Sequence, residues 1–141
     1  VADLLTPFRF TINGKEVEKK FVGGLLGHWA VWTRSAVELL KQIKMEKPND
    51  QIIQKWLSDG VKITDMNAAI FDVAHAFHGC IPGIHEVLRR QGLLEGLWCL
   101  NPEEQLSPGQ AEEIDRVIQA YPEFTDDEFV KEFLEKMNVN A

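Results

Sequence analysis

Three histidines and a cysteine lie close together in the middle of the chain: His75, His78, Cys80 and His85. Imidazole nitrogen and thiolate sulfur are ligands that zinc prefers. His75 and His78 are three residues apart, so they would share one face of a continuous helix. Their spacing matches no strong zinc motif. We therefore expect them to form hydrogen bonds with the backbone near a helix break, and we predict no metal and no other cofactor.

Charged clusters are the next candidates for chemistry. The pairs Glu103-Glu104 and Glu112-Glu113 could act as acid and base, but their charge density and position favour a solvated helix start. Arg89 and Arg90 could bind an anion, but they suit the last turn of a helix equally well. The sequence contains no glycine-rich phosphate loop and no spacing typical of a Ser–His–Asp triad.

The fourth histidine, His28, lies in the glycine- and tryptophan-rich segment FVGGLLGHWAVWT. This segment lacks helical periodicity, so we predict a buried strand from Leu25 to Trp32. Its glycines indicate a close approach of backbone, either to neighbouring strands or to a ligand. The alternative is tight packing, in which the glycines leave room for the tryptophan rings.

Composition and charge narrow the class of protein. The chain has 141 residues and a net charge of −7, with acidic residues concentrated between Glu103 and Glu135. Phosphates would be repelled, so we expect no nucleic acid partner. No apolar run approaches the roughly 18 residues of a membrane span, and no signal peptide is evident. The two cysteines form no CxxC motif, which favours a reducing, cytoplasmic location.

Helical stripes with matching caps predict that the chain is mainly α, or nearly all α in isolation. We expect one helix to end at Gly60, the next to extend from about Thr64 to Phe77 with Phe77 in the core, and a third to end before Gly92. Near the N-terminus, the sequence FTINGKEV predicts a hairpin around Asn-Gly. Two capping boxes open the last helices: Ser107 to Gln110 and Thr125 to Glu128.

Three blocks of the chain, between about residues 23 and 114, resemble the C-terminal end of the dihydrodipicolinate synthase and N-acetylneuraminate lyase family. The blocks are LLGHWAVWT, DMNAAIFDVAHAFHGCIPGIHEVLRRQGL and LWCLNPEEQLSPGQAEEI. They are similar to the eighth barrel strand, to a long helix with a short break and a second helix, and to the proline-containing connector with the last helix. The resemblance implies the last strand of a (β/α)₈ barrel followed by a C-terminal helical region.

The resemblance also implies Schiff-base lyase or aldolase chemistry on 2-oxo acids, through a lysine on the sixth strand and a tyrosine on the fourth. Neither strand is represented here, so no catalytic residue is carried over. The C-terminal ends of barrel strands face the active site. Gly27 and His28 are therefore the candidate substrate-binding residues. The partners that the resemblance implies are the N-terminal barrel half or full-length subunits, in a homo-oligomer.

We accordingly divide the chain into residues 1–47, the end of the barrel, and residues 48–141, the C-terminal helical region. The leading hypothesis is the C-terminal part of a Schiff-base lyase that needs its other half for activity. A second hypothesis is a non-catalytic helical module for interaction or oligomerisation, and a third is a metal-binding regulatory domain.

Overall fold

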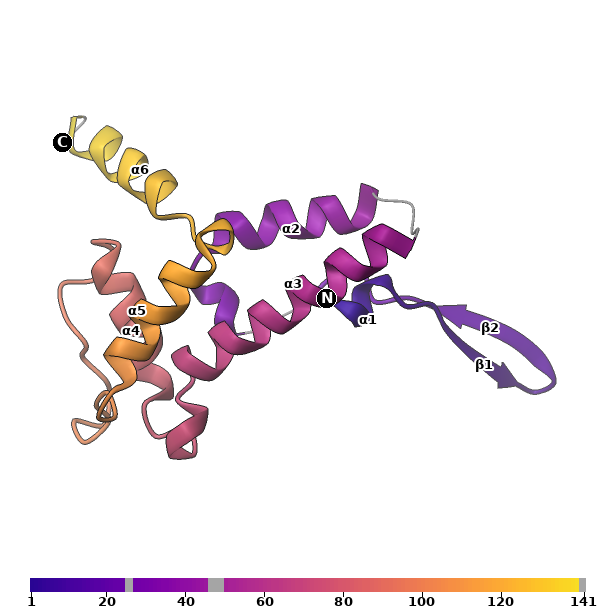
Figure 1. Cartoon of the computed structure of the whole chain (residues 1–141), viewed down its shortest axis with the longest axis horizontal. Helices are drawn as coiled ribbons and strands as arrows, with labels where there is room; N and C mark the ends of the chain where they lie inside the picture. The colour runs from indigo at the N-terminus through magenta and orange to yellow at the C-terminus, as the bar shows by residue number, and fades with distance from the viewer. Residues whose placement is uncertain (25–26, 46–49, 140–141) are drawn as a thin grey trace.

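A computed structural model of the chain describes residues 1–24, 27–45 and 50–139. Within this part the chain is mainly helical, as predicted, with a single antiparallel hairpin (Figure 1). The helices in chain order are α1 (Ala2–Leu5), η1 (Gly27–Ala30), α2 (Thr33–Met45), α3 (Asp50–Ile70), η2 (Val73–His75), α4 (Cys80–Arg90), α5 (Gln110–Ala120), η3 (Pro122–Phe124) and α6 (Asp127–Val139). None of these described helices has the length and apolar character needed to cross a membrane.

The core lies where α3, α4 and α5 pack together, and the residues around η1 close one side of it. Its buried side chains come from distant parts of the sequence: Val31, Trp32, Ile63, Met66, Ala69, Ile70, Val87, Ile114, Val117 and Phe124. An ion-pair and hydrogen-bond cluster ties α3 to α5 at the surface, because Asp65 accepts bonds from both Arg116 and the Tyr121 hydroxyl. Burial of this apolar surface is the main stabilising term of the fold.

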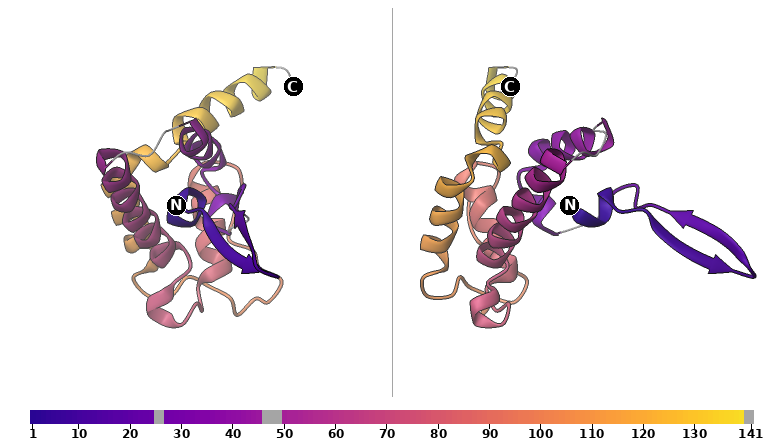
Figure 2. Two further views of the ribbon diagram at one scale, coloured as in Figure 1. Left: turned by 90° about the vertical axis from the view of Figure 1, so that its right-hand side faces the viewer. Right: turned by 45° about the vertical axis from the view of Figure 1, so that its right-hand side comes forward.

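The hairpin joins β1 (Phe8–Ile12) to β2 (Lys15–Lys19) and extends away from the helices (Figures 1 and 2). Its turn is the predicted Asn-Gly pair, and both residues have the positive φ angles that a type I′ turn requires. The two strands contact each other far more than they contact any helix. An isolated two-stranded hairpin is marginally stable in water, so we expect further contacts to hold it.

Helix α3 joins the two helices that were predicted to end at Gly60 and to begin near Thr64, and it ends earlier than predicted. Gly60 lies within it and has a helical φ angle, not the left-handed φ angle of a helix stop. The helix ends at Ile70, before Asp72, Ala76 and Phe77 adopt positive φ angles. The prediction that the helix continues to a buried Phe77 is therefore wrong, and Phe77 is 58% exposed.

The predicted strand from Leu25 to Trp32 is also wrong where the structure describes it. Leu25 and Leu26 lie outside the described residues, and η1 is a 3₁₀ helix followed by a hydrogen bond from the Val31 N–H to the His28 carbonyl. A single strand without a neighbour would leave its backbone groups unpaired. The local bonds of a 3₁₀ turn satisfy part of them without a partner strand.

We predict that Ile70→Ala and Phe77→Ala have very different effects on stability. Ile70 is fully buried at the end of α3, so its truncation should leave a cavity and lower the free energy of unfolding by about 2–5 kcal/mol. Phe77→Ala should cost less than ~1 kcal/mol, because the ring is largely in solvent. Urea unfolding of both variants measures this, and equal losses would contradict the packing described here.

Candidate functional site

His28, one of the two candidate substrate-binding residues, lies fully inside the protein with 0% exposure. Its Nδ1 atom is 2.8 Å from Oδ1 of Asn67 on α3, so Nδ1 carries the hydrogen and donates it to the amide oxygen. The ring packs against Trp29 and Trp32, with centroid distances of 4.3 and 5.6 Å. Burial lowers the pKa of His28 to about 4, although the bond with Asn67 raises it in part. His28 is therefore neutral at pH 7.

Two buried nitrogens in this cluster have no hydrogen-bond partner among the described residues. They are Nε2 of His28, which is an acceptor in this tautomer, and Nε1 of Trp32, which is a donor. An unsatisfied buried polar atom costs about 1–3 kcal/mol, so such atoms need a physical explanation. A neutral imidazole acceptor beside an indole donor is suited to a small polar group, and this chemistry is compatible with a binding role.

The other candidate, Gly27, lies against the ring of Phe71. A Cβ atom at this position would be 3.1 Å from the ring, which is a tight contact. The local need for glycine is therefore explained by packing between η1 and the end of α3. Gly27 also lines a groove, whereas His28 points into the core, so the two residues do not face one common space in this structure.

The groove runs between the N-terminus, η1, α2 and α3, and its volume is about 690 Å³. Almost all of its lining is apolar or glycine: Val1, Leu4, Gly24, Gly27, Trp29, Ala30, Thr33, Ala36, Val37, Leu39, Leu40, Ile43 and Ile63. Among the described residues, none of the side chains that line it is ionisable, so these side chains offer no acid, base or nucleophile. A surface of this kind fits an apolar partner segment better than a reacting substrate.

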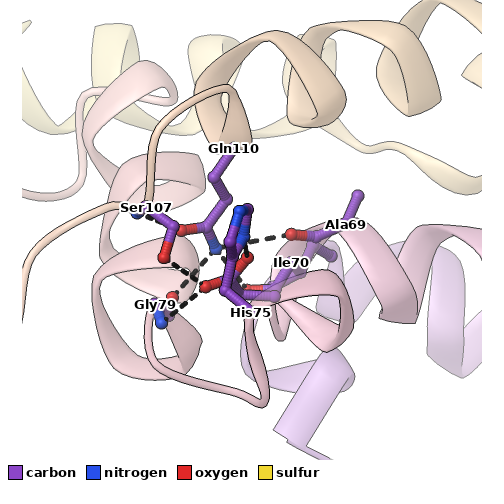
Figure 3. Close-up of polar contacts among 7 residues, drawn as sticks. Ala69, Ile70, His75, Gly79, Ser107 and Gln110 are labelled. Carbon is purple, nitrogen blue, oxygen red and sulfur yellow. Dashed lines mark hydrogen bonds and ion pairs between the residues drawn. The ribbon is translucent and has the colours of Figure 1, made fainter.

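A second cluster of polar residues surrounds Asp72, directly after α3. Figure 3 shows His75, Gly79, Ser107 and Gln110 of this cluster close to one another. The Asp72 carboxylate accepts hydrogen bonds from the Ser107 hydroxyl and, at 2.9 Å, from the Gly79 N–H, and it pairs with Nδ1 of His75 at 2.6 Å. Burial opposes ionisation of Asp72, but these bonds outweigh it and lower the pKa of the carboxyl below 3.8. The carboxylate is thus ionised and fully engaged.

Serine, aspartate and histidine are the residue types of a hydrolytic triad, but their order here differs. In a triad, histidine lies between the serine hydroxyl and the aspartate and takes the proton. Here Asp72 lies between Ser107 and His75, and the imidazole makes its described bond to the carboxylate. Ser107 therefore donates to a carboxylate of lowered pKa, which is a weak base, and not to an imidazole, so a structural role suits the cluster best.

Gln110 completes this structural role. Its side-chain N–H groups donate to the carbonyls of Ile70 and Gly79 at 3.2 and 2.9 Å, and its oxygen accepts the Ser107 N–H at 3.1 Å. The last bond is half of the predicted capping box, although the Ser107 hydroxyl binds Asp72 instead of capping the helix. A Cβ atom on Gly83 would lie 2.0 Å from the Ile70 carbonyl oxygen, so only glycine fits there.

Several of the remaining candidates make contacts within the chain. His85 lies 3.8 Å from the Cys99 sulfur, and the residues that the structure describes contain no group of three potential metal ligands. Arg89 and Arg90 both pair with the buried Glu86. Burial first, and Glu104 second, raise the pKa of both cysteine thiols, which makes them weak nucleophiles.

Comparisons of the chain with protein-family models, with curated proteins and with solved structures found no match. The functional residues must therefore be judged from their own chemistry. Sequence reasoning missed Asn67 and Asp72, and it assigned Gln110 only a role in the capping box, although these residues make the decisive buried contacts. Asp72 lies inside the helix predicted from Thr64 to Phe77, so the sequence pattern gave no signal for its buried contacts.

We predict that His28 makes stability depend on pH between 6.5 and about 4. The folded state binds the proton more weakly than the unfolded state, so acidification through this range favours unfolding. The contribution of His28 should reduce the free energy of unfolding by up to about 1.4 kcal/mol per pH unit. Urea unfolding of His28→Gln should lack this component. His78→Gln, an exposed control, should retain it, and equal behaviour of the two variants would contradict the burial of His28.

We predict that Asp72→Asn destabilises the protein by about 1–3 kcal/mol at neutral pH, because buried donors lose a charged acceptor. The pKa of Asp72 is lowered, so its contribution is complete above pH 3.8 and is lost as pH falls through the lower pKa of the folded state. The difference in the free energy of unfolding between wild type and Asp72→Asn should therefore shrink below pH 3.8. The exposed Asp3→Asn variant is the control, and a constant difference down to pH ~2 would exclude this role.

Proposed function

We propose that this chain is the C-terminal part of a Schiff-base lyase that resembles dihydrodipicolinate synthase and acts on 2-oxo acids once its barrel is complete. The observation that carries the proposal is the helix–connector–helix block. Helix α4 ends just before Gly92, and α5 begins directly after Gly109, both glycines with positive φ. This order supports the resemblance, which rests on the same residues.

The groove beside η1 and α2 gives the proposal physical support. In a complete barrel, α2 would cover the outside of the sheet. The groove borders the helical core, because Ile63 belongs to both and Trp29 and Leu39 pack against that core. A barrel half packed into the groove would bury its apolar lining.

In this proposal the present chain contributes support and not chemistry. The imine-forming lysine and the proton-relay tyrosine belong to barrel strands outside it, so no cofactor and no catalytic residue is assigned here. Gly27 and His28 remain the proposed substrate-binding residues, placed on the 3₁₀ helix η1 and not on a strand. Residues 48–141 would brace the barrel and contribute to contacts between subunits of a cytoplasmic homo-oligomer.

One observation favours a second candidate, a non-catalytic helical module for interaction or oligomerisation. The core of α3, α4 and α5 is complete, and the network of Asp72 and Gln110 is satisfied by this chain alone. A body of this kind can fold without a barrel. The two candidates differ in whether a lysine upstream of Val1 reacts with a 2-oxo acid.

We predict that pyruvate and borohydride leave the isolated chain unmodified, because none of the lysines that the structure describes lies in an apolar site that could lower its pKa for imine formation. A longer polypeptide that includes the sequence encoded upstream of Val1 should gain one pyruvate adduct on a lysine in that upstream part. Mass spectrometry of tryptic peptides gives the position. An adduct within this chain, or none on the longer polypeptide, would refute the proposal, and the second result would favour the helical module.

A further inference from the structure

The hairpin has two faces of different character. Pairing of β1 and β2 places one set of side chains on the first face: Phe8, Phe10, Ile12, Lys15, Val17 and Lys19. Arg9, Thr11, Glu16 and Glu18 occupy the opposite, polar face. The Phe21 ring packs edge-on against Phe8, with a centroid distance of 5.4 Å, and covers that end of the face. Phe10 in the middle and Ile12 beside the turn are 51% and 55% exposed, so most of the apolar face lacks a cover within the described chain.

Helix α6 has the same property at the other end of the molecule. Val130 is buried against the helical body, whereas Phe129, Phe133 and Met137 are exposed. These three residues follow each other at four-residue intervals and form one stripe along the helix. Phe133 is 48% exposed. The stripe thus presents a second apolar surface, which projects from the body as the hairpin does (Figure 1).

The charges around these two surfaces are opposite. Residues 8–20 carry four basic and two acidic side chains, for a net charge of +2, although the whole chain has −7. Residues 122–139 carry six acidic and two basic side chains, for a net charge of −4. Lys15 and Lys19 border the apolar face of the hairpin, and Glu128 and Glu132 lie on α6 beside the stripe. Opposite charges around apolar centres are typical of complementary interfaces.

We propose that two copies of this chain bind each other antiparallel, with the hairpin of each copy on the α6 stripe of the other. The hairpin and α6 lie at opposite ends of the long axis of the molecule (Figure 1). An antiparallel pair therefore makes the same contact twice and closes on itself, as twofold symmetry requires. The inference is independent of the proposed lyase function, because it uses neither the groove nor a barrel.

A second copy is a better occupant than an unrelated protein because both halves of the contact are present in one sequence. The hairpin and α6 each have an apolar centre, and the charges that border the two centres are opposite in sign. The contact also gives the hairpin the additional packing that a two-stranded sheet needs in water. An unrelated partner that is complementary to one of the two surfaces would leave the other surface exposed.

The first experiment measures the mass of the 141-residue chain by sedimentation equilibrium. We expect a dimer at protein concentrations of ~10–100 µM, weakened by high salt because the charges around the contact are exposed. Phe10→Ser should raise the dissociation constant by at least ~10-fold through loss of a central aromatic contact. The control is Thr11→Ser, which changes the neighbouring residue on the polar face and should leave the constant unchanged.

The second experiment exchanges the charges. One variant carries Lys15→Glu and Lys19→Glu, and the other carries Glu128→Lys and Glu132→Lys. Each variant alone should be monomeric, because its hairpin and its α6 carry charges of the same sign and would repel each other at both contacts of a dimer. A 1:1 mixture should form a heterodimer, in which one contact has exchanged charges and the other is wild type. Circular dichroism of each variant checks that the helical body is unchanged.

Three results would overturn the proposal. The first is a wild-type chain that remains monomeric at ~100 µM. The second is a dimer that survives Phe10→Ser, which would place the interface elsewhere, for example on the apolar groove. The third is a failure of the two folded charge variants to associate when mixed, which would show that hairpin and α6 do not meet.

Discussion

The buried groups of Asp72 and Gln110 replace the hydrogen bonds that α3 loses where it stops. The last carbonyls of a helix have no partner within it, and leaving them unpaired in the core would be costly. Gln110 donates to the Ile70 carbonyl, and Asp72 accepts the Gly79 N–H and so fixes the turn that leads to α4. Because Gly83 lies against the same carbonyl, α4 can pack closely on α3. The three-helix core depends on this junction.

The sequence predicted those features that depend on neighbouring residues. The Asn-Gly turn and the left-handed Gly92 need only local backbone geometry, and both are confirmed. Predictions failed where distant contacts decide the outcome. Gly60 carries a stop signal in isolation, but packing of α1 against α3 and a helical φ angle allow the helix to continue. Phe77 fits the apolar stripe, yet three positive φ angles after Ile70 turn it into solvent.

The candidate site was predictable in part for the same reason. His28 was identifiable because a histidine in an apolar, glycine-rich segment is unusual, but its partner Asn67 is 39 residues away and gave no signal. The strand prediction assumed neighbouring strands. Without them in the chain, the backbone of residues 27–30 forms local bonds, and the apolar side chains of the segment turn toward α3. The two unsatisfied nitrogens of His28 and Trp32 are the cost of this arrangement.

The uncovered apolar surfaces of the molecule differ in kind, and this difference separates their roles. The described side chains that line the groove beside η1 carry no charge, so its burial would depend mainly on apolar area. Apolar contacts of this type are characteristic of permanent association. The surfaces of the hairpin and α6 are bordered by charges of opposite sign, which favour rapid and reversible association. Binding of a partner in the groove would therefore be driven by apolar burial, and binding of a second copy at the hairpin would also depend on the opposite charges. The two contacts use different residues, so one does not exclude the other.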